Sequence, residues 1–329
     1  MVQPIPATAW SAVVHAYGGA VTVEKRPVYP PGPGEALVRI ATSPINPSDL
    51  LYIMGEYGFR KPLPMIPGFE ASGQIVAVGE GVSEALIGLR VACTYGTMDG
   101  TWAEYMRTAA TNCIPLPDHI DLEHGAMLIA NPLTAHLLLD KASGMKAVVQ
   151  TAAASALGRM IIRLAQRRGI QVINVVHRQE QVNDLQALGA DHVLNSSDPA
   201  FETRLRELCH DLGAHLAFES VAGPLSGQIL SALPDASTLI VYGALSLQPC
   251  AIPPAELIFR KKRVDGFWLI DWLSASSMES LVSIVTEVFS AAESDFKTEV
   301  RARYPLPEVA AAINDYMNHM TGGKVLLVP

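Results

Sequence analysis

Between residue 146 and about residue 245, short apolar runs alternate with amphipathic segments, and this alternation constrains the fold more than any other feature. Three of the apolar runs are KAVVQTA (146–152), IQVINVV (170–176) and TLIVYGA (238–244). Near-continuous apolar strands that alternate with helices are typical of a parallel sheet with both faces covered. This part of the chain is therefore predicted to be an α/β domain with a doubly wound parallel sheet.

The segments between these runs have the period of a helix. Residues 155–168 are predicted to be one helix, and Leu205, Leu208, Cys209 and Leu212 repeat at i, i+3, i+4 and i+7 in another. The first third of the chain is different. It is rich in Pro and Gly and holds short β-type runs such as ALVRIA (36–41) and GQIVAV (73–78), which predicts an irregular, mostly β domain.

These changes of pattern predict two domains, one of them discontinuous. We expect residues 1–122 to form the first part of a β-rich catalytic domain, 123–265 a cofactor-binding domain, and 266–329 a return to the catalytic domain. The terminal run KVLLVP is a short strand that needs a partner in that domain. The active site is expected in the cleft between the domains, at the carboxyl ends of the parallel strands.

Composition narrows the class of protein. The chain has 329 residues, 49% of them hydrophobic and 17% charged, which is enough apolar material for a sizeable core. A net charge of −8 disfavours nucleic acid and anionic membranes as partners. No secretory signal, membrane span or patterned cysteine set is apparent, so we expect a cytoplasmic enzyme with reduced thiols.

The strand at residues 146–152 leads into the segment TAAASALGRM (151–160), where a dinucleotide fold places its phosphate-binding turn. Gly158 is the only glycine of this turn, so the motif by itself is weak. Any position of the turn that needs a positive φ would be strained. The residues predicted to hold the pyrophosphate are Ala154, Ser155, Ala156, Leu157 and Gly158.

The end of the second strand distinguishes between the two nicotinamide cofactors. NAD-binding folds place a carboxylate about 20 residues after the glycine turn. Here Arg178 stands 20 residues after Gly158, next to His177. A guanidinium binds phosphate through two hydrogen bonds, so the pair favours the 2′-phosphate of NADPH. Gln179 is a further candidate contact.

Further motifs follow one another along the chain: PGPGEALVRI, INPSDL, PGFEASGQIVAVG, GTWAEY, NPLTA, LGADHVLN, VYG and GGKVLLV. In this order they resemble the medium-chain dehydrogenase/reductase superfamily over nearly the whole length. The segments INPSDLLYIMGEYG (45–58) and GFWLIDW (266–272) are similar to those of quinone reductases and mitochondrial-type 2-enoyl thioester reductases. The resemblance implies a GroES-like catalytic domain beside a Rossmann-type one, and a homodimer.

Zinc-dependent members of this superfamily carry a histidine between the glycine and the glutamate of a Gly-His-Glu motif. This chain has Gly68, Phe69 and Glu70 there, and no cysteine stands near Asn46. A phenyl ring cannot bind zinc, and the run of four close cysteines typical of a structural zinc lobe is absent. No metal is therefore predicted, and zinc-dependent alcohol oxidation is disfavoured.

The resemblance assigns a catalytic tyrosine to Tyr57. Hydride from the nicotinamide would add to the β carbon of an α,β-unsaturated thioester or ketone, and the α carbon would then need a proton. An ordinary phenol stays protonated at neutral pH, so Tyr57 can donate that proton or a hydrogen bond to the oxyanion. The same residue could instead pack at a turn, and Tyr52 is expected to pack.

The resemblance also marks positions around the nicotinamide and the substrate. The residues predicted near the cofactor are Asn131, Thr134, Tyr242, Gly243, Ala244, Leu245, Phe267, Trp268, Leu269 and Lys324. Asn46, Tyr57 and Trp272 are predicted to contact the substrate.

Three functions are compatible with these residues. The first is NADPH-dependent reduction of an activated carbon–carbon double bond, and the second is NADPH:quinone oxidoreduction on the same fold. The third is a cofactor-binding protein without catalysis, because the phosphate turn has so little glycine. Binding and turnover of NADPH distinguish these alternatives.

Overall fold

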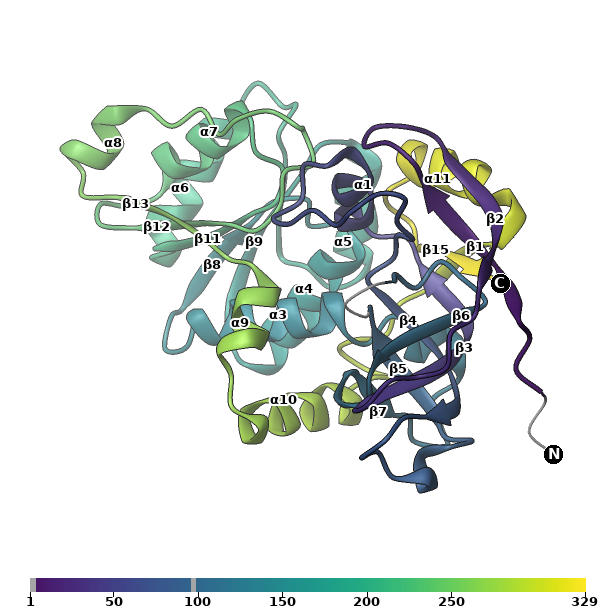
Figure 1. Ribbon diagram of the computed structural model, residues 1–329. Coiled ribbons are helices and arrows are strands. Elements are labelled where there is room, and N and C mark those ends of the chain that lie inside the picture. The colour runs from purple at the N-terminus through teal and green to yellow at the C-terminus, as the bar shows by residue number, and fades with distance from the viewer. Residues whose placement is uncertain (1–3, 96–98) are drawn as a thin grey trace. The chain divides into compact units, whose positions relative to one another are not determined.

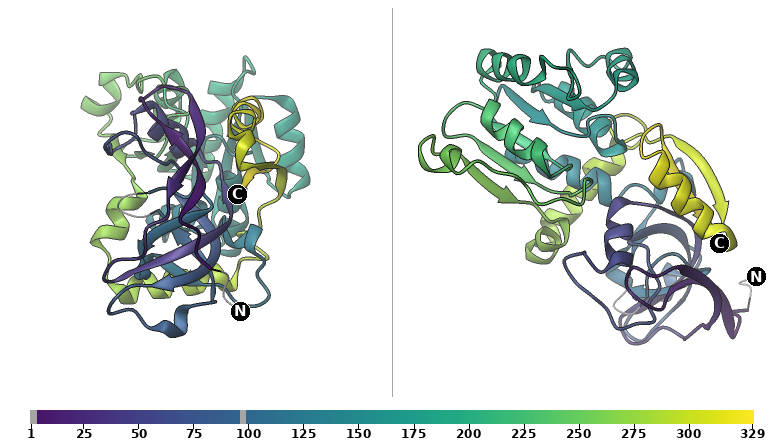
Figure 2. Two further views of the ribbon diagram at one scale, coloured as in Figure 1. Left: turned by 45° about the vertical axis from the view of Figure 1, so that its right-hand side comes forward. Right: turned by 90° about the horizontal axis from the view of Figure 1, so that it is seen from above.

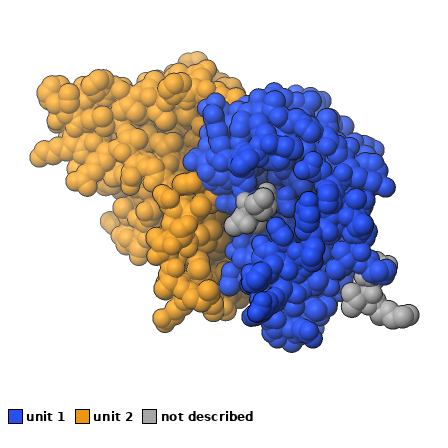
Figure 3. Space-filling model, viewed as in Figure 1, with its two compact units in different colours: residues 1–130, 297–329 blue, residues 131–296 orange. Residues whose placement is uncertain are grey.

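The computed structural model describes residues 4–95 and 99–329. The chain divides into two compact units, which Figure 3 shows in different colours. Unit 1 comprises Met1–Ala130 and Lys297–Pro329, and unit 2 comprises Asn131–Phe296. Unit 1 is discontinuous, and its two boundaries lie later in the chain than the expected 122/123 and 265/266.

The first boundary lies after residue 130 rather than after residue 122, because residues 122–130 contact the β-rich unit. Helix α2 (Leu122–Gly125) packs on strands of that unit, and the backbone N–H groups of Ile129 and Ala130 donate to Glu70. The second boundary lies after residue 296 rather than after residue 265, because helix α10 (Met278–Ser290) belongs to unit 2. Arg167 pairs with Asp295 at 2.9 Å and thereby holds the segment after α10 to that unit.

Unit 1 is mainly β, as the sequence predicts. It holds a two-stranded sheet β1-β2 and a seven-stranded sheet in the order β14-β15-β3-β4-β5-β7, with β6 paired to β3. Its strands are β1 (Thr8–Val14), β2 (Val21–Pro27), β3 (Glu35–Pro44), β4 (Glu70–Val78), β5 (Arg90–Thr94), β6 (Tyr105–Ala109), β7 (Cys113–Pro115), β14 (Val300–Pro305) and β15 (Lys324–Val328).

The helices of unit 1 are short. They are α1 (Pro47–Met54), α2, α11 (Val309–Asn318) and the 3-10 helices η1 (Glu84–Leu86), η2 (Ala110–Asn112) and η3 (Leu306–Glu308). The terminal strand finds the partner that it requires, because β15 pairs antiparallel with β3 through Leu326 and Pro44. Figure 1 shows the chain ending in this unit.

Unit 2 is a six-stranded parallel sheet in the order β10-β9-β8-β11-β12-β13. Its strands are β8 (Ala147–Gln150), β9 (Gln171–Val176), β10 (His192–Asn195), β11 (Leu216–Glu219), β12 (Thr238–Val241) and β13 (Arg263–Gly266). Its helices are α3 (Ala130–Lys141), α4 (Ala156–Arg167), α5 (Gln179–Ala187), α6 (Phe201–Leu212), α7 (Pro224–Ala232), α8 (Pro254–Ile258), α9 (Leu269–Ala275) and α10.

Helices cover both faces of this sheet (Figure 1 and Figure 2). On one face α6 and α7 bury Leu205 and Ile229 against the strands. On the other face α4 and α5 bury Ile162 and Leu185. Cores on both sides explain why the strands are apolar at nearly every position, and they confirm the doubly wound α/β architecture.

No helix within residues 4–95 and 99–329 is long and apolar enough to span a bilayer.

Candidate cofactor and active sites

The loop after β8 ends in a capped helix start. Ser155 precedes α4, and its hydroxyl accepts a hydrogen bond from the N–H of Gly158 at 3.1 Å. Because a helix has no internal partners for its first N–H groups, those of Ala156 and Leu157 face the loop. The 12-residue helix α4 therefore presents two donors and the positive end of its dipole at the predicted pyrophosphate site.

Two residues of this loop show why small side chains are needed. Ala152 has a φ of 48°, so the strained position expected in a glycine-poor turn exists, and it is an alanine. A Cβ on Gly158 would lie 2.4 Å from the carbonyl oxygen of Ala153, so only glycine fits there. The single glycine of the turn stands at the position of closest backbone packing.

A buried carboxylate that the sequence did not single out holds this loop. Glu219, at the end of β11, is fully buried and accepts hydrogen bonds from the N–H groups of Val221 and Ala222 and from the Thr151 hydroxyl. Burial raises the pKa of Glu219, and the N–H donors oppose that rise. The signal was present in the sequence, because a carboxylate in the apolar strand LAFE needs buried donors.

Two buried side-chain amides inside the sheet also hold the loop between β8 and α4 in place. Gln150 donates from Nε2 to the carbonyl of Gly158 at 3.0 Å and to Asn174 Oδ1 at 2.7 Å. Asn174 in turn donates to the backbone carbonyls of Val172 and His192. The sheet interior thus fixes the first turn of α4, where the residues predicted to bind phosphate lie.

The residues predicted for the 2′-phosphate lie at the carboxyl end of β9. His177 and Arg178 are exposed, and their backbone N–H groups both donate to Gln181 Oε1 at 3.1 Å. The end of the neighbouring strand adds two hydroxyls that the sequence analysis did not include. Ser196 lies 3.2 Å from Nδ1 of His177, and Ser197 donates to the His177 carbonyl. A phosphate at this place would be bound by side chains, because the backbone N–H groups of His177 and Arg178 already donate to Gln181.

Gln179, predicted as a further contact, is the first residue of α5 and is exposed. Tyr242, Gly243, Ala244 and Leu245 follow β12 and are all half-buried. Their path is set by hydrogen bonds from the N–H of Tyr242 to the carbonyl of Glu219 and from that of Leu245 to Ser220. This segment therefore lies beside the end of β11, within the same strand-end region as Thr151.

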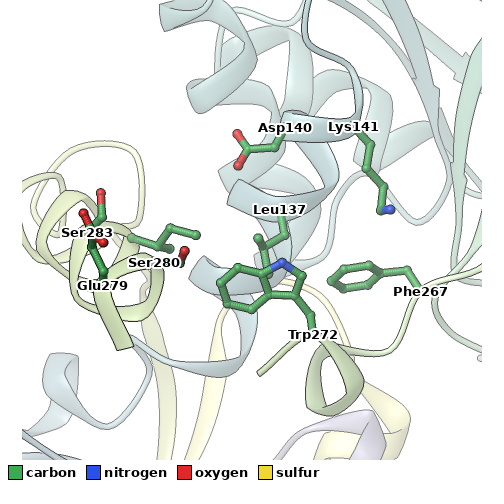
Figure 4. A pocket seen from close by; sticks show the side chains of 9 residues that line it. Leu137, Asp140, Lys141, Phe267, Trp272, Glu279, Ser280 and Ser283 are labelled. Carbon is green, nitrogen blue, oxygen red and sulfur yellow. The ribbon is translucent and has the colours of Figure 1, made fainter. Parts of the chain in front are cut away.

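A cavity of about 580 Å³ in unit 2 brings two predicted residues together (Figure 4). Phe267 and Trp272 line it with Leu137 and Ile284, while the polar part of the wall comes from α3 and α10. The polar residues are Asp140, Lys141, Glu279, Ser280 and Ser283. Its volume suits a small organic ligand.

Four other residues predicted beside the nicotinamide lie within a few positions, along the sequence, of residues that line this cavity. Trp268 and Leu269 begin α9 and are half-buried. Asn131 and Thr134 stand in the first turns of α3; Asn131 is half-buried, and Thr134 is 9% exposed.

In unit 1, Tyr57 belongs to an aromatic cluster. It follows the left-handed C-cap Gly55 of α1, and its ring lies 4.7 Å from that of Phe69 and 5.3 Å from that of Phe59. Tyr52 is 3% exposed and packs on the same rings, as expected. Phe69, which stands between Gly68 and Glu70, is therefore one of the rings of this cluster.

Two further predicted residues, Asn46 and Lys324, are buried in unit 1. Lys324 donates from Nζ to Asn46 Oδ1, and Asn46 Nδ2 donates to Glu70 Oε1 at 2.9 Å. Burial lowers the pKa of Lys324 and raises that of Glu70, and each charge opposes the shift of the other. Asn46 thus links the carboxylate of Glu70 to the ammonium of Lys324 within unit 1.

The residues present suit a phosphorylated dinucleotide. The capped start of α4 offers backbone donors for the pyrophosphate, and the end of β9 offers His177 and Arg178 for an additional phosphate. Across the described residues, no group of three His, Cys, Asp or Glu side chains could hold a metal ion.

Comparison with known proteins identifies the family of both units. Residues 32–118 match the alcohol dehydrogenase GroES-like domain, and residues 156–287 match the zinc-binding dehydrogenase family. The mitochondrial enoyl-[acyl-carrier-protein] reductase of Dictyostelium discoideum is 32% identical over 266 residues, which are 78% of this chain and 75% of that protein. The human enzyme is 28% identical over 301 residues, 88% of this chain and 80% of its own.

Solved structures agree with this assignment. A Mesorhizobium loti protein assigned as an NADPH:quinone reductase is 35% identical, with a TM-score of 0.91 over 99% of this chain and 100% of its own. A mycobacterial protein solved with NADPH is 27% identical, with a TM-score of 0.86 over 97% of this chain and 100% of its own. The chain belongs to the medium-chain dehydrogenase/reductase superfamily, in the branch of the quinone reductases and enoyl thioester reductases.

Proposed function

We propose that this protein reduces an activated carbon–carbon double bond with NADPH. The substrate is a 2-enoyl thioester or an enone, hydride adds to its β carbon, and the α carbon is protonated. The observation that carries the proposal is the packing of Tyr57 on Phe69, 4.7 Å between ring centroids. A phenyl ring cannot be a metal ligand, so the polar group that this cluster offers is a phenol, which can donate a proton.

The bound nicotinamide would supply the hydride. The chain's own residues would hold it: the N–H groups of Ala156 and Leu157 bind the pyrophosphate, and Arg178 with His177 binds the 2′-phosphate. Tyr57 donates to the developing oxyanion or protonates the α carbon. The similarity to proteins solved with NADPH supports this choice of cofactor.

The cavity beside Trp272 is proposed to accept part of the substrate. Leu137, Phe267, Trp272 and Ile284 provide an apolar surface for an acyl chain or a ring, and Lys141 provides a cation at the wall. Filling the cavity with Leu137→Trp should raise KM for long-chain enoyl thioesters more than for crotonyl thioesters. An equal rise in KM for both thioesters would show that the acyl chain does not bind in this cavity.

Quinone reduction is a second candidate, because the aromatic rings of Phe267 and Trp272 in the same cavity could stack on a planar quinone. The similarity to the Mesorhizobium loti protein favours it too. NADPH oxidation measured across enoyl thioesters, enones, quinones and aldehydes distinguishes the two. Turnover of quinones alone would select the second candidate.

NADPH fluorescence titration tests the shared requirement of both enzyme functions. We expect saturable binding of NADPH that is tighter than that of NADH. Binding without turnover of any acceptor would support a non-catalytic role, and failure to bind at high micromolar NADPH would refute both reductase functions.

The chain is also proposed to form a homodimer through the edge of the unit 2 sheet. All four residues of edge strand β13 are exposed, and Ile258 and Phe259 beside it are 67% and 78% exposed. An open strand edge with apolar neighbours is a template for pairing with a second copy. Light scattering should give a dimer mass for the wild type and a monomer mass for Val264→Lys, and a monomeric wild type would refute this proposal.

A further inference from the structure

Glu70 is a buried carboxylate at the start of β4, only 1% exposed, that accepts three N–H hydrogen bonds. One comes from Asn46 Nδ2 at 2.9 Å, and the others come from the backbone of Ile129 at 3.3 Å and Ala130 at 2.8 Å. Ala130 is the first residue of α3. Glu70 therefore caps this helix from a different part of the chain, where a local N-cap side chain would normally serve.

The other side of Asn46 is bound by the C-terminal strand. Lys324 is 4% exposed and donates from Nζ to Asn46 Oδ1, while its backbone N–H donates to the carbonyl of Glu299 at 2.8 Å. Asp49 Oδ2 accepts from the backbone N–H of Asn46 at 2.7 Å. Glu70, Asp49 and Lys324 are the charged groups of this network, so the single ammonium lies near two carboxylates.

This network reaches both places where the chain passes from one compact unit into the other. The chain leaves unit 1 after Ala130 and re-enters it at Lys297. Glu70 binds Ala130 directly, and Lys324 binds Glu299 two residues after the return. The side chain of Glu70 thus holds the backbone before the first connection, and the backbone of Lys324, whose ammonium binds Asn46, holds the backbone after the second.

We propose that Glu70, held by Asn46 and Lys324, is a positioning residue for hydride transfer. It fixes the backbone at the first residue of α3, the helix that carries Asn131 and Thr134. The inference rests on the proposed function, in which Asn131 and Thr134 lie on the nicotinamide side. Small displacements at such positions cost much rate, because hydride transfer needs a closely defined geometry.

A carboxylate is required because all three partners of Glu70 are donors. Glutamine at this position would accept with one oxygen and would place its own N–H₂ against another donor. Glu70→Gln must therefore break at least one hydrogen bond. The double variant Asn46→Asp with Glu70→Gln restores them all, because the new carboxylate accepts from both the glutamine amide and Lys324, leaving the glutamine oxygen for Ile129 and Ala130.

The experiment compares kcat and the primary isotope effect on kcat, using NADPH with deuterium at the transferred C4 position. For Glu70→Gln we expect kcat per folded molecule to fall on the order of 10- to 100-fold and the isotope effect to rise, because hydride transfer becomes slower than the other steps. The double variant should recover most of the lost kcat. Ile75→Val, a buried change in the same strand, is the control for stability and should leave the isotope effect unchanged.

Hydrogen exchange at the amides of Ile129 and Ala130 gives a second readout that needs no turnover. Exchange there should accelerate about tenfold or more in Glu70→Ala, which removes both acceptor oxygens, and should stay normal in the double variant, which keeps an oxygen for both amides. Should Glu70→Gln not fold, Glu70→Asp takes its place, since a shorter carboxylate reaches fewer of the three donors. An unchanged isotope effect and kcat, or unchanged exchange at both amides, would overturn the inference.

The wild type in the same assay separates this inference from the proposed function. If none of the tested acceptors supports NADPH oxidation by the wild type, the proposed function fails. The exchange rates alone then decide whether Glu70 fixes the start of α3. If the wild type turns over and Glu70→Gln matches it, only the positioning role fails.

Discussion

The ring of Tyr57 packs against the ring of Phe69, with centroids 4.7 Å apart and planes inclined by 36°. Phe59, Tyr52 and Tyr95 surround the same phenyl ring at 6.1, 5.2 and 5.1 Å. Such contacts add to the stabilisation from apolar burial and restrict how the rings can turn. The aromatic cluster therefore restricts the orientation of Tyr57, as its proposed role of proton donor requires.

Tyr57→Phe should keep the cluster packed and remove only the hydroxyl. We expect kcat to fall roughly 100-fold, a typical contribution of a positioned acid, with the Kd for NADPH unchanged. Tyr52→Phe is the matched control, because the Tyr52 hydroxyl is buried and finds no hydrogen-bond partner among the described residues. Stopped-flow turnover and fluorescence titration measure the two quantities. Equal turnover of wild type and Tyr57→Phe would remove the tyrosine from the mechanism.

Arg178→Ala tests the assignment of the 2′-phosphate. Since hydrogen bonds to charged groups are worth about 1.5–3 kcal/mol, the Kd for NADPH should rise on the order of 10- to 100-fold, while that for NADH hardly changes. Arg206→Ala removes an exposed arginine of α6 and should alter neither Kd. Titration with both cofactors gives the values, and equal losses for NADPH and NADH would refute the role of Arg178.

Ala152→Gly should stabilise the protein. A φ of 48° is unfavourable for alanine and easy for glycine, so we expect a gain of about 0.5–1 kcal/mol in the free energy of unfolding. Ala153→Gly, one residue on, removes a fully buried methyl group at a residue without positive φ and should cost about 1 kcal/mol. Urea denaturation compares the two, and a loss of stability in Ala152→Gly would show that the alanine conformation is not strained.

The regular elements of unit 2 were predictable because their signals are local. The helix predicted at 155–168 is α4 (Ala156–Arg167), with Ser155 and Arg168 as its caps, since a capping hydroxyl and an apolar stripe are read from neighbouring residues. The pairing of the C-terminal strand with β3 was predictable for a similar reason, because an apolar terminal strand needs a partner. These features depend on short stretches of chain.

The support of the candidate sites was not predictable, because it joins distant residues. Nothing local in the sequence indicates that Glu70 caps α3 or that Lys324 binds Asn46, and Lys324 was expected to face the cofactor. The unit boundary after Phe296 likewise depends on the ion pair between Arg167 and Asp295. Such pairs are set by the tertiary fold, although a lone carboxylate in an apolar strand, as at Glu219, does signal that buried donors exist.

Asp49 predicts how the stability of unit 1 depends on pH. Burial raises the pKa of Asp49 from its ordinary value of 3.8 to about 7, Glu70 adds to this rise, and Lys324 opposes it. Because the native pKa lies above the unfolded one, the native state binds more protons between these two values. The contribution of Asp49 to stability is therefore complete below about pH 4 and is lost as pH rises to about 7.

Asp49→Asn removes this titration while keeping an oxygen to accept the N–H of Asn46. The free energy of unfolding of the wild type should fall, relative to that of the variant, by roughly 2–4 kcal/mol between pH 4 and pH 8, since one pKa unit corresponds to about 1.4 kcal/mol. Asp118→Asn, an exposed aspartate of the same unit, should run parallel to the wild type. Urea titrations at four pH values measure the curves. If wild type and Asp49→Asn run parallel as well, Asp49 is ionised throughout and Lys324 balances both carboxylates.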